Sequence, residues 1–184
     1  MADGNGARPH TRREGIGSVL ETDRLVVREF TATDASFILR LLNEPSFIEN
    51  IGDRGVRSLE QAERYLLAGP IESYRRRGHG LWLVALKETL QPIGMCGLLK
   101  RDQLPDVDLG YAFFPEFWSR GYAHESARAV LDWAAERGID RIVAIVSPGN
   151  AASIRLLNKL GFAFERMATL SPGEAAVSLH RLHL

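Results

Sequence analysis

The chain has 184 residues, and its 23 lysines and arginines balance its 23 aspartates and glutamates, so the formal net charge is zero. This length suits one domain with a full hydrophobic core, and the balanced charge gives no sign of a surface for nucleic acid or a membrane. The single cysteine, Cys96, excludes an intramolecular disulfide and a cysteine-based zinc site, and we expect it in the core.

The first 18 residues are polar and lack the apolar centre of a secretory signal. We therefore expect a flexible arm over 1–18 and one domain over 19–184. No apolar run approaches the roughly 18 residues of a membrane span, so we expect a cytoplasmic protein. His10, His180 and His183 show no ligand spacing, and we expect no metal site.

The N-terminal elements begin with Arg24–Phe30, whose alternation predicts a strand. Thr33 is expected to cap a helix that runs to Asn43 and is ended by Pro45. The polar, glycine-containing segment Asn50–Arg57 predicts a loop.

A capping-box pattern, Ser58 with Gln61, opens the second predicted helix, which Pro70 should kink before it ends near Arg77. Short turns then separate three apolar runs, so we expect an antiparallel meander. Its strands are Leu81–Leu86, Ile93–Lys100 and Val107–Phe114.

The C-terminal elements are predicted as a helix over Ala123–Arg137, a central strand over Ile142–Val146, a helix ending near Leu160, and a hairpin of Phe162–Leu170 with Ala175–Leu182. The order is β-α-α-β-β-β-α-β-α-β-β, which predicts an α/β domain. Its strand–helix–strand unit requires a parallel pair with a right-handed crossover. We expect one mixed sheet with helices on both faces.

The stretch from Val107 to Ser126 carries the clearest functional signal. An apolar run ends at Pro115, and Arg120-Gly121-Tyr122-Ala123 then opens a helix. First-turn N–H groups lack intrahelical partners, and the helix dipole adds about half a positive charge there. Gly121 has no side chain to block a phosphate, and Arg120 adds charge. The stretch predicts a cradle for a nucleotide-like cofactor.

Three segments resemble the GNAT superfamily of N-acetyltransferases, and specifically its RimJ/RimL-like branch. They are TDRLVVREF near the start, EFWSRGYAHE over 116–125, and NAAS with NKLGF over 150–162. The resemblance covers about residues 20–184 and implies the GNAT fold, with acetyl-CoA as cosubstrate and an amine as acceptor.

The resemblance also implies that strands 107–114 and 142–146 part, opened by a bulge near Phe113. The pantetheine arm would lie in the gap, bonded to the backbone at Phe113 and Phe114. Trp118 stands where the superfamily carries Gln or Arg, and we interpret it as packing. The implied cofactor-binding residues are Phe113, Phe114, Trp118, Ser119, Arg120, Gly121, Tyr122, Ala123, His124, Glu125, Asn150 and Ser153.

Acetyl transfer requires a neutral amine, so a carboxylate base is expected. Asp108 matches the position of a glutamate base in some GNAT enzymes; the alternative is an edge carboxylate paired with Arg101 or simply solvated. Glu116 is a second candidate, or else a surface charge. Backbone N–H groups around Phe114 would stabilise the tetrahedral intermediate.

The sequence does not identify the acid that protonates the leaving thiolate. Many GNAT enzymes use a tyrosine where this chain has Leu157, so the role falls to water or to Ser153, or is vacant. Ser153 is also a candidate cofactor ligand, or bonds only its own backbone. Asn150 is a helix N-cap or a ligand of the pantetheine arm.

We interpret the chain as an enzyme that transfers an acetyl group from acetyl-CoA to a primary amine, on a protein N-terminus or a small molecule, by direct attack. The alternative is a CoA-thioester-sensing module without turnover. A dinucleotide-binding protein does not fit, because no G-x-G-x-x-G follows the first strand. The acceptor pocket is expected at the early helices and the 50–57 loop, and a homodimer is left open.

Overall fold

The computed structural model describes residues 17–173 and 175–184. Most of the predicted arm, and His10 with it, lies outside the described residues. The strands are β1 (Ser18–Glu21), β2 (Leu25–Arg28), β3 (Leu81–Leu86), β4 (Pro92–Leu99), β5 (Val107–Phe113), β6 (Arg141–Val146), β7 (Ala163–Ala168) and β8 (Val177–His183). The α-helices are α1 (Ala35–Leu42), α2 (Pro45–Ile51), α3 (Leu59–Leu66), α4 (Glu72–Arg77), α5 (Tyr122–Ala135) and α6 (Ala151–Leu160).

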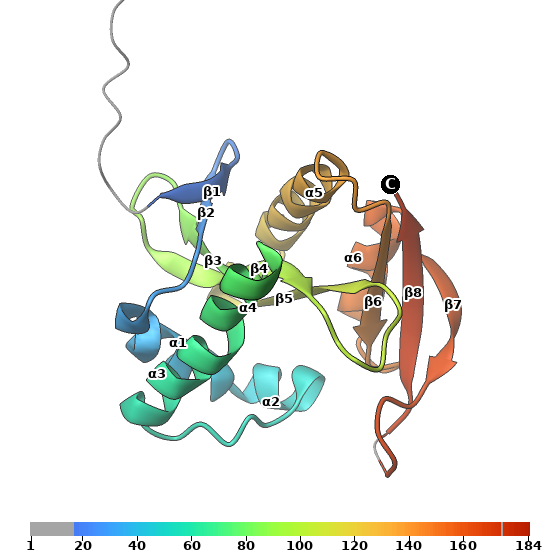
Figure 1. Ribbon diagram of the computed structural model, residues 1–184, viewed down its shortest axis with the longest axis horizontal. Coiled ribbons are helices and arrows are strands. Elements are labelled where there is room, and N and C mark those ends of the chain that lie inside the picture. Colours follow the sequence, from blue (N-terminus) through green and yellow to red (C-terminus); the bar gives the residue numbers. More distant parts are fainter. Residues whose placement is uncertain (1–16, 174) are drawn as a thin grey trace, which may run out of the picture.

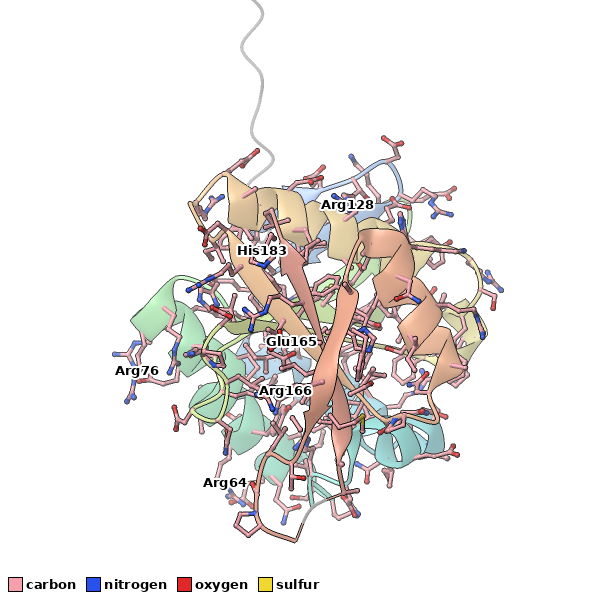
Figure 2. All side chains as sticks on the ribbon, turned by 90° about the vertical axis from the view of Figure 1, so that its right-hand side faces the viewer. Arg64, Arg76, Arg128, Glu165, Arg166 and His183 are labelled. Carbon is pink, nitrogen blue, oxygen red and sulfur yellow. The ribbon has the colours of Figure 1, made fainter. Side chains whose placement is uncertain are left out.

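The strands form one mixed sheet in the order β1-β2-β3-β4-β5-β6-β8-β7, antiparallel except for the β5–β6 pair. Figure 1 shows α5 on one side of strands β3 to β5 and helices α1, α3 and α4 on the other. Figure 2 shows β7 at the edge of the sheet that faces the viewer, with Glu165 and Arg166 on it. The predicted mixed α/β domain, its central meander and its closing hairpin are confirmed.

The core lies between the sheet and the helices on both faces. Four α5 residues, Ala127, Val130, Leu131 and Ala134, are each 0% exposed. Cys96 on β4 is also fully buried, as predicted. Burial raises the pKa of the Cys96 thiol to about 12, so this thiol stays protonated at neutral pH.

The second predicted helix begins at its capping box and is interrupted at Pro70, as the sequence predicts. The Ser58 hydroxyl accepts a hydrogen bond from the Gln61 N–H, and the Gln61 side-chain oxygen accepts one from the Ser58 N–H, which is a capping box. Pro70 lies in a π-helical turn, Leu67–Ile71, between α3 and α4. A proline ring cannot fit a regular helix interior, so the ladder widens there.

The N-terminal part differs from the expectations at one cap and contains two features that were not predicted. Pro45 does not only end a helix but begins α2, because the first helical position needs no N–H donor. The segment Ser18–Glu21 forms strand β1 by pairing with β2, although it is too short to show a pattern. Thr31 rather than Thr33 begins the 3₁₀ turn before α1, and its N–H donates to the Asp34 carboxylate at 2.8 Å.

Candidate functional site

Strands β5 and β6 part after a short paired stretch, as expected. They pair only at Val107 with Ile142 and at Asp108 with Val143 in the described chain. Strand β5 then continues to Phe113 alongside β4, while β6 continues to Val146 alongside β8. Figure 1 shows the two strands running in different directions beyond their contact. The middle of the sheet therefore has an open edge on each strand.

The expected bulge near Phe113 is absent from β5. The β4–β5 register is unbroken through Gly94 opposite Phe113. The irregularity lies instead in β4, where Ile93 is skipped between the pairs Val84–Gly94 and Ala85–Pro92 with β3. The parting thus results from β6 following β8 while β5 follows β4.

The open edge of β5 presents backbone groups of Tyr111 and Phe113. The N–H of Phe114 donates to the Ile93 carbonyl at 3.1 Å, so it is not available at the parting. Antiparallel pairs alternate in the direction of their hydrogen bonds, which turns the N–H groups of Tyr111 and Phe113 toward β6. This corrects the expectation that Phe114 donates at the parting.

Trp118 fixes the end of this edge. Its indole N–H donates to the Phe113 carbonyl at 2.8 Å, although the side chain is 47% exposed. The residue therefore acts as a hydrogen-bond donor as well as a packing group. It ties the loop before α5 to the last residue of β5.

The loop and first turn of α5 form the predicted cradle. Ser119 and Gly121 have φ values of 58° and 84°, in the left-handed region, and Gly121 is the N-cap. The first helical bond runs from the Glu125 N–H to the Gly121 carbonyl at 2.9 Å. Within residues 17–173 and 175–184, none of the N–H groups of 119–124 donates a hydrogen bond to the protein. Several unpaired N–H groups at a helix start form an anion site.

Arg24 adds to the cradle, and sequence reasoning missed it. Its side chain bonds the Glu125 carboxylate at 2.7 Å and the Arg120 carbonyl at 3.0 Å. Thr22 donates to the same carboxylate at 2.6 Å. A Cβ atom at Gly121 would lie 3.2 Å from the Arg24 guanidinium. The only sequence signal was the TDRL segment itself, since the partners are 101 positions apart.

The remaining predicted cradle residues lie around this turn. Arg120 and His124 are exposed, and Tyr122 and Ala123 are half-buried. The Arg120 guanidinium lies 6.0 Å from the Phe117 ring centre. Glu116 pairs with Arg40 at 2.8 Å on the surface, which fits a surface charge rather than a second candidate base.

The start of α6 faces the parting from the other side. The Asn150 side chain accepts a hydrogen bond from the Ser153 N–H at 3.0 Å, so Asn150 is an N-cap. The Ser153 hydroxyl lies 2.5 Å from the Tyr111 hydroxyl on β5. Tyr111 was not assigned a role from sequence, because the contact spans 42 positions. Leu157, one turn further on, is 1% exposed and packs in the core.

Asp108 occupies the point where β5 and β6 separate. It is 1% exposed and pairs with Arg101 at 2.6 Å, so it is a buried partner of Arg101 rather than an edge carboxylate. Burial raises the pKa of Asp108 to about 6, although Arg101 and the nearby Ile145 N–H favour the charged form. Its Oδ1 atom lacks a hydrogen bond of normal geometry among the described residues.

A shallow hollow of about 460 Å³ lies on the helical side of the domain. Its lining residues are Ser36, Leu39, Arg40, Asn43, Arg57 and Leu59. It includes neither Asp108 nor Gly121, so it is separate from the parting. Arg40 links it to the loop before α5 through Glu116.

The described residues contain neither a membrane-spanning helix nor a cluster of metal ligands. No helix there is long and apolar enough to cross a membrane. No group of three or more histidine, cysteine, aspartate or glutamate side chains is arranged to hold a metal ion in the same residues.

The Acetyltransferase (GNAT) domain family matches residues 24–163. The uncharacterised N-acetyltransferase YoaA of Bacillus subtilis is 32% identical over 149 residues, which cover 80% of this chain and 84% of YoaA. A crystal structure of an acetyltransferase from Agrobacterium tumefaciens is 25% identical, with a TM-score of 0.75 over 97% of this chain and 100% of that one.

The ribosomal L7/L12 α-N-protein acetyltransferase RimL, solved in complex with coenzyme A, has a TM-score of 0.79 over 91% of this chain and 98% of its own. At 17% identity this similarity concerns the fold alone. The family match over most of the sequence and the relation to YoaA settle the assignment. The chain belongs to the GNAT acetyltransferase family, and it is an acetyl-CoA-dependent N-acetyltransferase.

Proposed function

We propose that the protein acetylates a primary amine, on a protein N-terminus or a small molecule, by direct attack of the amine on the thioester of acetyl-CoA. One observation carries the proposal. A helix start with unbonded N–H groups lies beside the open backbone edge of β5. The first feature suits a diphosphate, and the second suits an extended arm with amide groups.

The diphosphate would lie on the backbone of the cradle. The N–H groups of Gly121, Tyr122 and Ala123 supply donors, and the absent side chain of Gly121 leaves room. Exposed Arg120 supplies charge from solvent. Ser119 and His124 would contribute backbone groups, while Glu125 holds Arg24 and thereby fixes the turn.

The pantetheine arm would follow β5 as an added strand. Tyr111 offers its N–H and carbonyl, whereas Phe113 offers its N–H, because Trp118 already bonds the Phe113 carbonyl. The same two N–H groups are placed to bond the oxyanion of a tetrahedral intermediate, in place of Phe114. Asn150 would approach the arm only through its amide nitrogen, since its oxygen caps α6.

Asp108 is the proposed base. An alkylamine has a pKa of about 10 and a peptide α-amine one of about 8, so either acceptor is mostly protonated at neutral pH and must lose a proton before it attacks. Burial raises the pKa of Asp108 to about 6, which makes the carboxylate a stronger base that is still ionised at neutral pH. Its unbonded Oδ1 atom is the acceptor, with a water molecule as the link to the amine where direct contact is not reached.

The leaving thiolate would be assisted by Ser153 at the first turn of α6. Leu157 cannot donate a proton, so the family's usual acid is missing. A thiolate with a pKa near 8.5 is a fair leaving group at neutral pH. A hydrogen bond from a hydroxyl is then sufficient assistance.

The acceptor is proposed as a peptide N-terminus first and a small amine second. RimL is named as an α-N-protein acetyltransferase of L7/L12, and its similar fold supports a peptide N-terminus as the acceptor. Helix α2 contacts the far side of the parting, where the Asn50 carbonyl accepts from the Ser147 hydroxyl at 3.4 Å. An acceptor entering there would meet Asp108 from the helical face.

The test is a CoA titration by calorimetry followed by an acceptor screen. Acetyl-CoA is incubated with short peptides that differ in their first residue and with small primary amines, and released thiol is measured. We expect CoA to bind and at least one amine to be acetylated. CoA binding with no transfer to any amine would support the sensing module, and no CoA binding would contradict the site.

A further inference from the structure

One side-chain contact joins β5 to α6 across the parting. The Tyr111 hydroxyl lies 2.5 Å from the Ser153 hydroxyl and 3.5 Å from the Ser153 carbonyl. Elsewhere along the described parts of the two elements, no other side-chain hydrogen bond links them. The pair therefore lies where the thioester end of the donor is proposed to sit.

The two hydroxyls differ in what else they can do. Ser153 has one O–H, and its backbone N–H is already held by Asn150 at 3.0 Å. If that O–H turns toward a sulfur atom, Oγ is left as an acceptor, and Tyr111 is the neighbour that can donate to it. Hydrogen bonds in such a chain polarise one another, so the second strengthens the first.

Tyr111 is suited to donate a hydrogen bond without giving up its proton. Burial raises the pKa of Tyr111 to about 12, and Cys96 and Asp108 nearby oppose its ionisation further. Transfer of its proton to a thiolate with a pKa near 8.5 is therefore unfavourable. The 2.5 Å contact with the Ser153 hydroxyl makes the phenol a hydrogen-bond donor to Ser153 rather than an acid.

We infer that Tyr111 is a positioning residue for the acetyl-transfer step, which aims the Ser153 hydroxyl at the leaving sulfur of coenzyme A. This inference rests on the proposed function. As the tetrahedral intermediate collapses, the C–S bond breaks, its electron pair stays on sulfur, and the carbonyl forms again. Ser153 donates a hydrogen bond to the thiolate and Tyr111 donates one to Ser153, while the proton that sulfur finally takes comes from water.

The ionisation of CoA bound to the protein tests the pair without an acceptor. Thiolate absorbance near 240 nm is followed against pH for free CoA and for complexes of the wild type, Tyr111→Phe, Ser153→Ala and the double variant. Cys96 adds no signal, because burial raises its pKa to about 12. Protein spectra without CoA are subtracted, and Tyr65→Phe controls for the loss of another largely buried phenol.

We expect the wild type to lower the thiol midpoint below that of free CoA. Each single variant should raise the midpoint by about one pH unit while the CoA Kd changes less than threefold. The double variant should have the same midpoint as either single variant. Ser153→Thr keeps a hydroxyl, so its midpoint should lie close to that of the wild type.

Two results would overturn the inference. If Ser153→Ala moves the midpoint and Tyr111→Phe does not, the phenol has no role in aiming the serine. If Tyr111→Phe instead tightens CoA binding at an unchanged midpoint, the Tyr111–Ser153 hydrogen bond is a contact that must break before CoA binds. Failure of the wild type to bind CoA would overturn the proposed function as well, and the titration shows this separately.

Discussion

Arg24 and Glu125 form an ion pair at 2.6 Å although they lie in different layers of the domain, one after the β1 strand and one in the first turn of α5. The pair attaches the N-terminal hairpin to the cradle turn, because Arg24 also bonds the Arg120 carbonyl. Glu125 thus serves the site without presenting its charge to a ligand. The cradle geometry depends on a residue about a hundred positions away.

Removing this clamp should weaken CoA binding. We expect Arg24→Ala to raise the CoA Kd about fivefold, because one hydrogen bond contributes about 1 kcal/mol. Calorimetry checks the affinity. Arg64→Ala is the control, since it removes an exposed ion pair on α3. Equal Kd values for the two variants would show that the clamp is not needed.

Gly121→Val should raise the CoA Kd at least tenfold. Its φ of 84° is strained for a branched side chain, and the new Cβ would lie 3.2 Å from Arg24. The matched control is Gly138→Val, whose φ is 72° but which has open space at the other end of α5. Both variants should lose similar stability in a melting curve, and only Gly121→Val should lose affinity. Unchanged binding by Gly121→Val would exclude the cradle.

Trp118 should report CoA binding by fluorescence. It is the exposed member of the three tryptophans, whereas Trp82 and Trp133 pack edge to face in the core with ring centres 4.9 Å apart. We expect CoA to change the emission of the wild type but not of Trp118→Phe. The variant also loses the bond to Phe113 and should bind CoA a few-fold more weakly. An equal emission change in the variant would place CoA elsewhere.

Asp108→Asn should lower the acetyl-transfer rate and flatten the acidic limb of its pH profile. The wild-type limb should have a midpoint near pH 6, where the carboxylate forms, since burial raises the pKa of Asp108 to about 6. Steady-state rates from pH 5 to 8 check this. A profile unchanged by the substitution would remove Asp108 from the mechanism.

The same carboxyl should make stability fall as pH rises. Its folded-state pKa of about 6 lies above the ordinary 3.8, so the native state binds the proton more tightly than the unfolded state. Its contribution is therefore present below pH 3.8 and lost as the pH passes 6. Relative to Asp108→Asn, wild-type stability should fall by about 3 kcal/mol over this range. Denaturation midpoints measured at several pH values check the sign, and a rise would contradict it.

Local signals in the sequence were enough for most of the fold. The capping box at Ser58 and the proline at 70 each act within one turn of chain, and the structure has them in those roles. Strand β1 could not be predicted, because four residues show no period and its stability comes from pairing with β2. Pro45 was ambiguous, since a proline both ends one helix and suits the first turn of the next.

In the candidate site, too, features within one segment of chain could be predicted and contacts between distant segments could not. The cradle at Gly121 is local, so a glycine before a helix predicted it. The Arg24–Glu125 pair and the Tyr111–Ser153 contact join distant segments, and only the fold brings them together. The direction of the β5 hydrogen bonds also required the register, which is why Phe114 was expected to donate where Tyr111 and Phe113 do.

A crystal structure of the protein with coenzyme A tests the central claim most directly. The account predicts diphosphate oxygens within about 3 Å of the N–H groups of Gly121, Tyr122 and Ala123, and a pantetheine arm between β5 and β6 along Tyr111 and Phe113. A diphosphate bound away from that turn, or an arm lying outside the two strands, would contradict it.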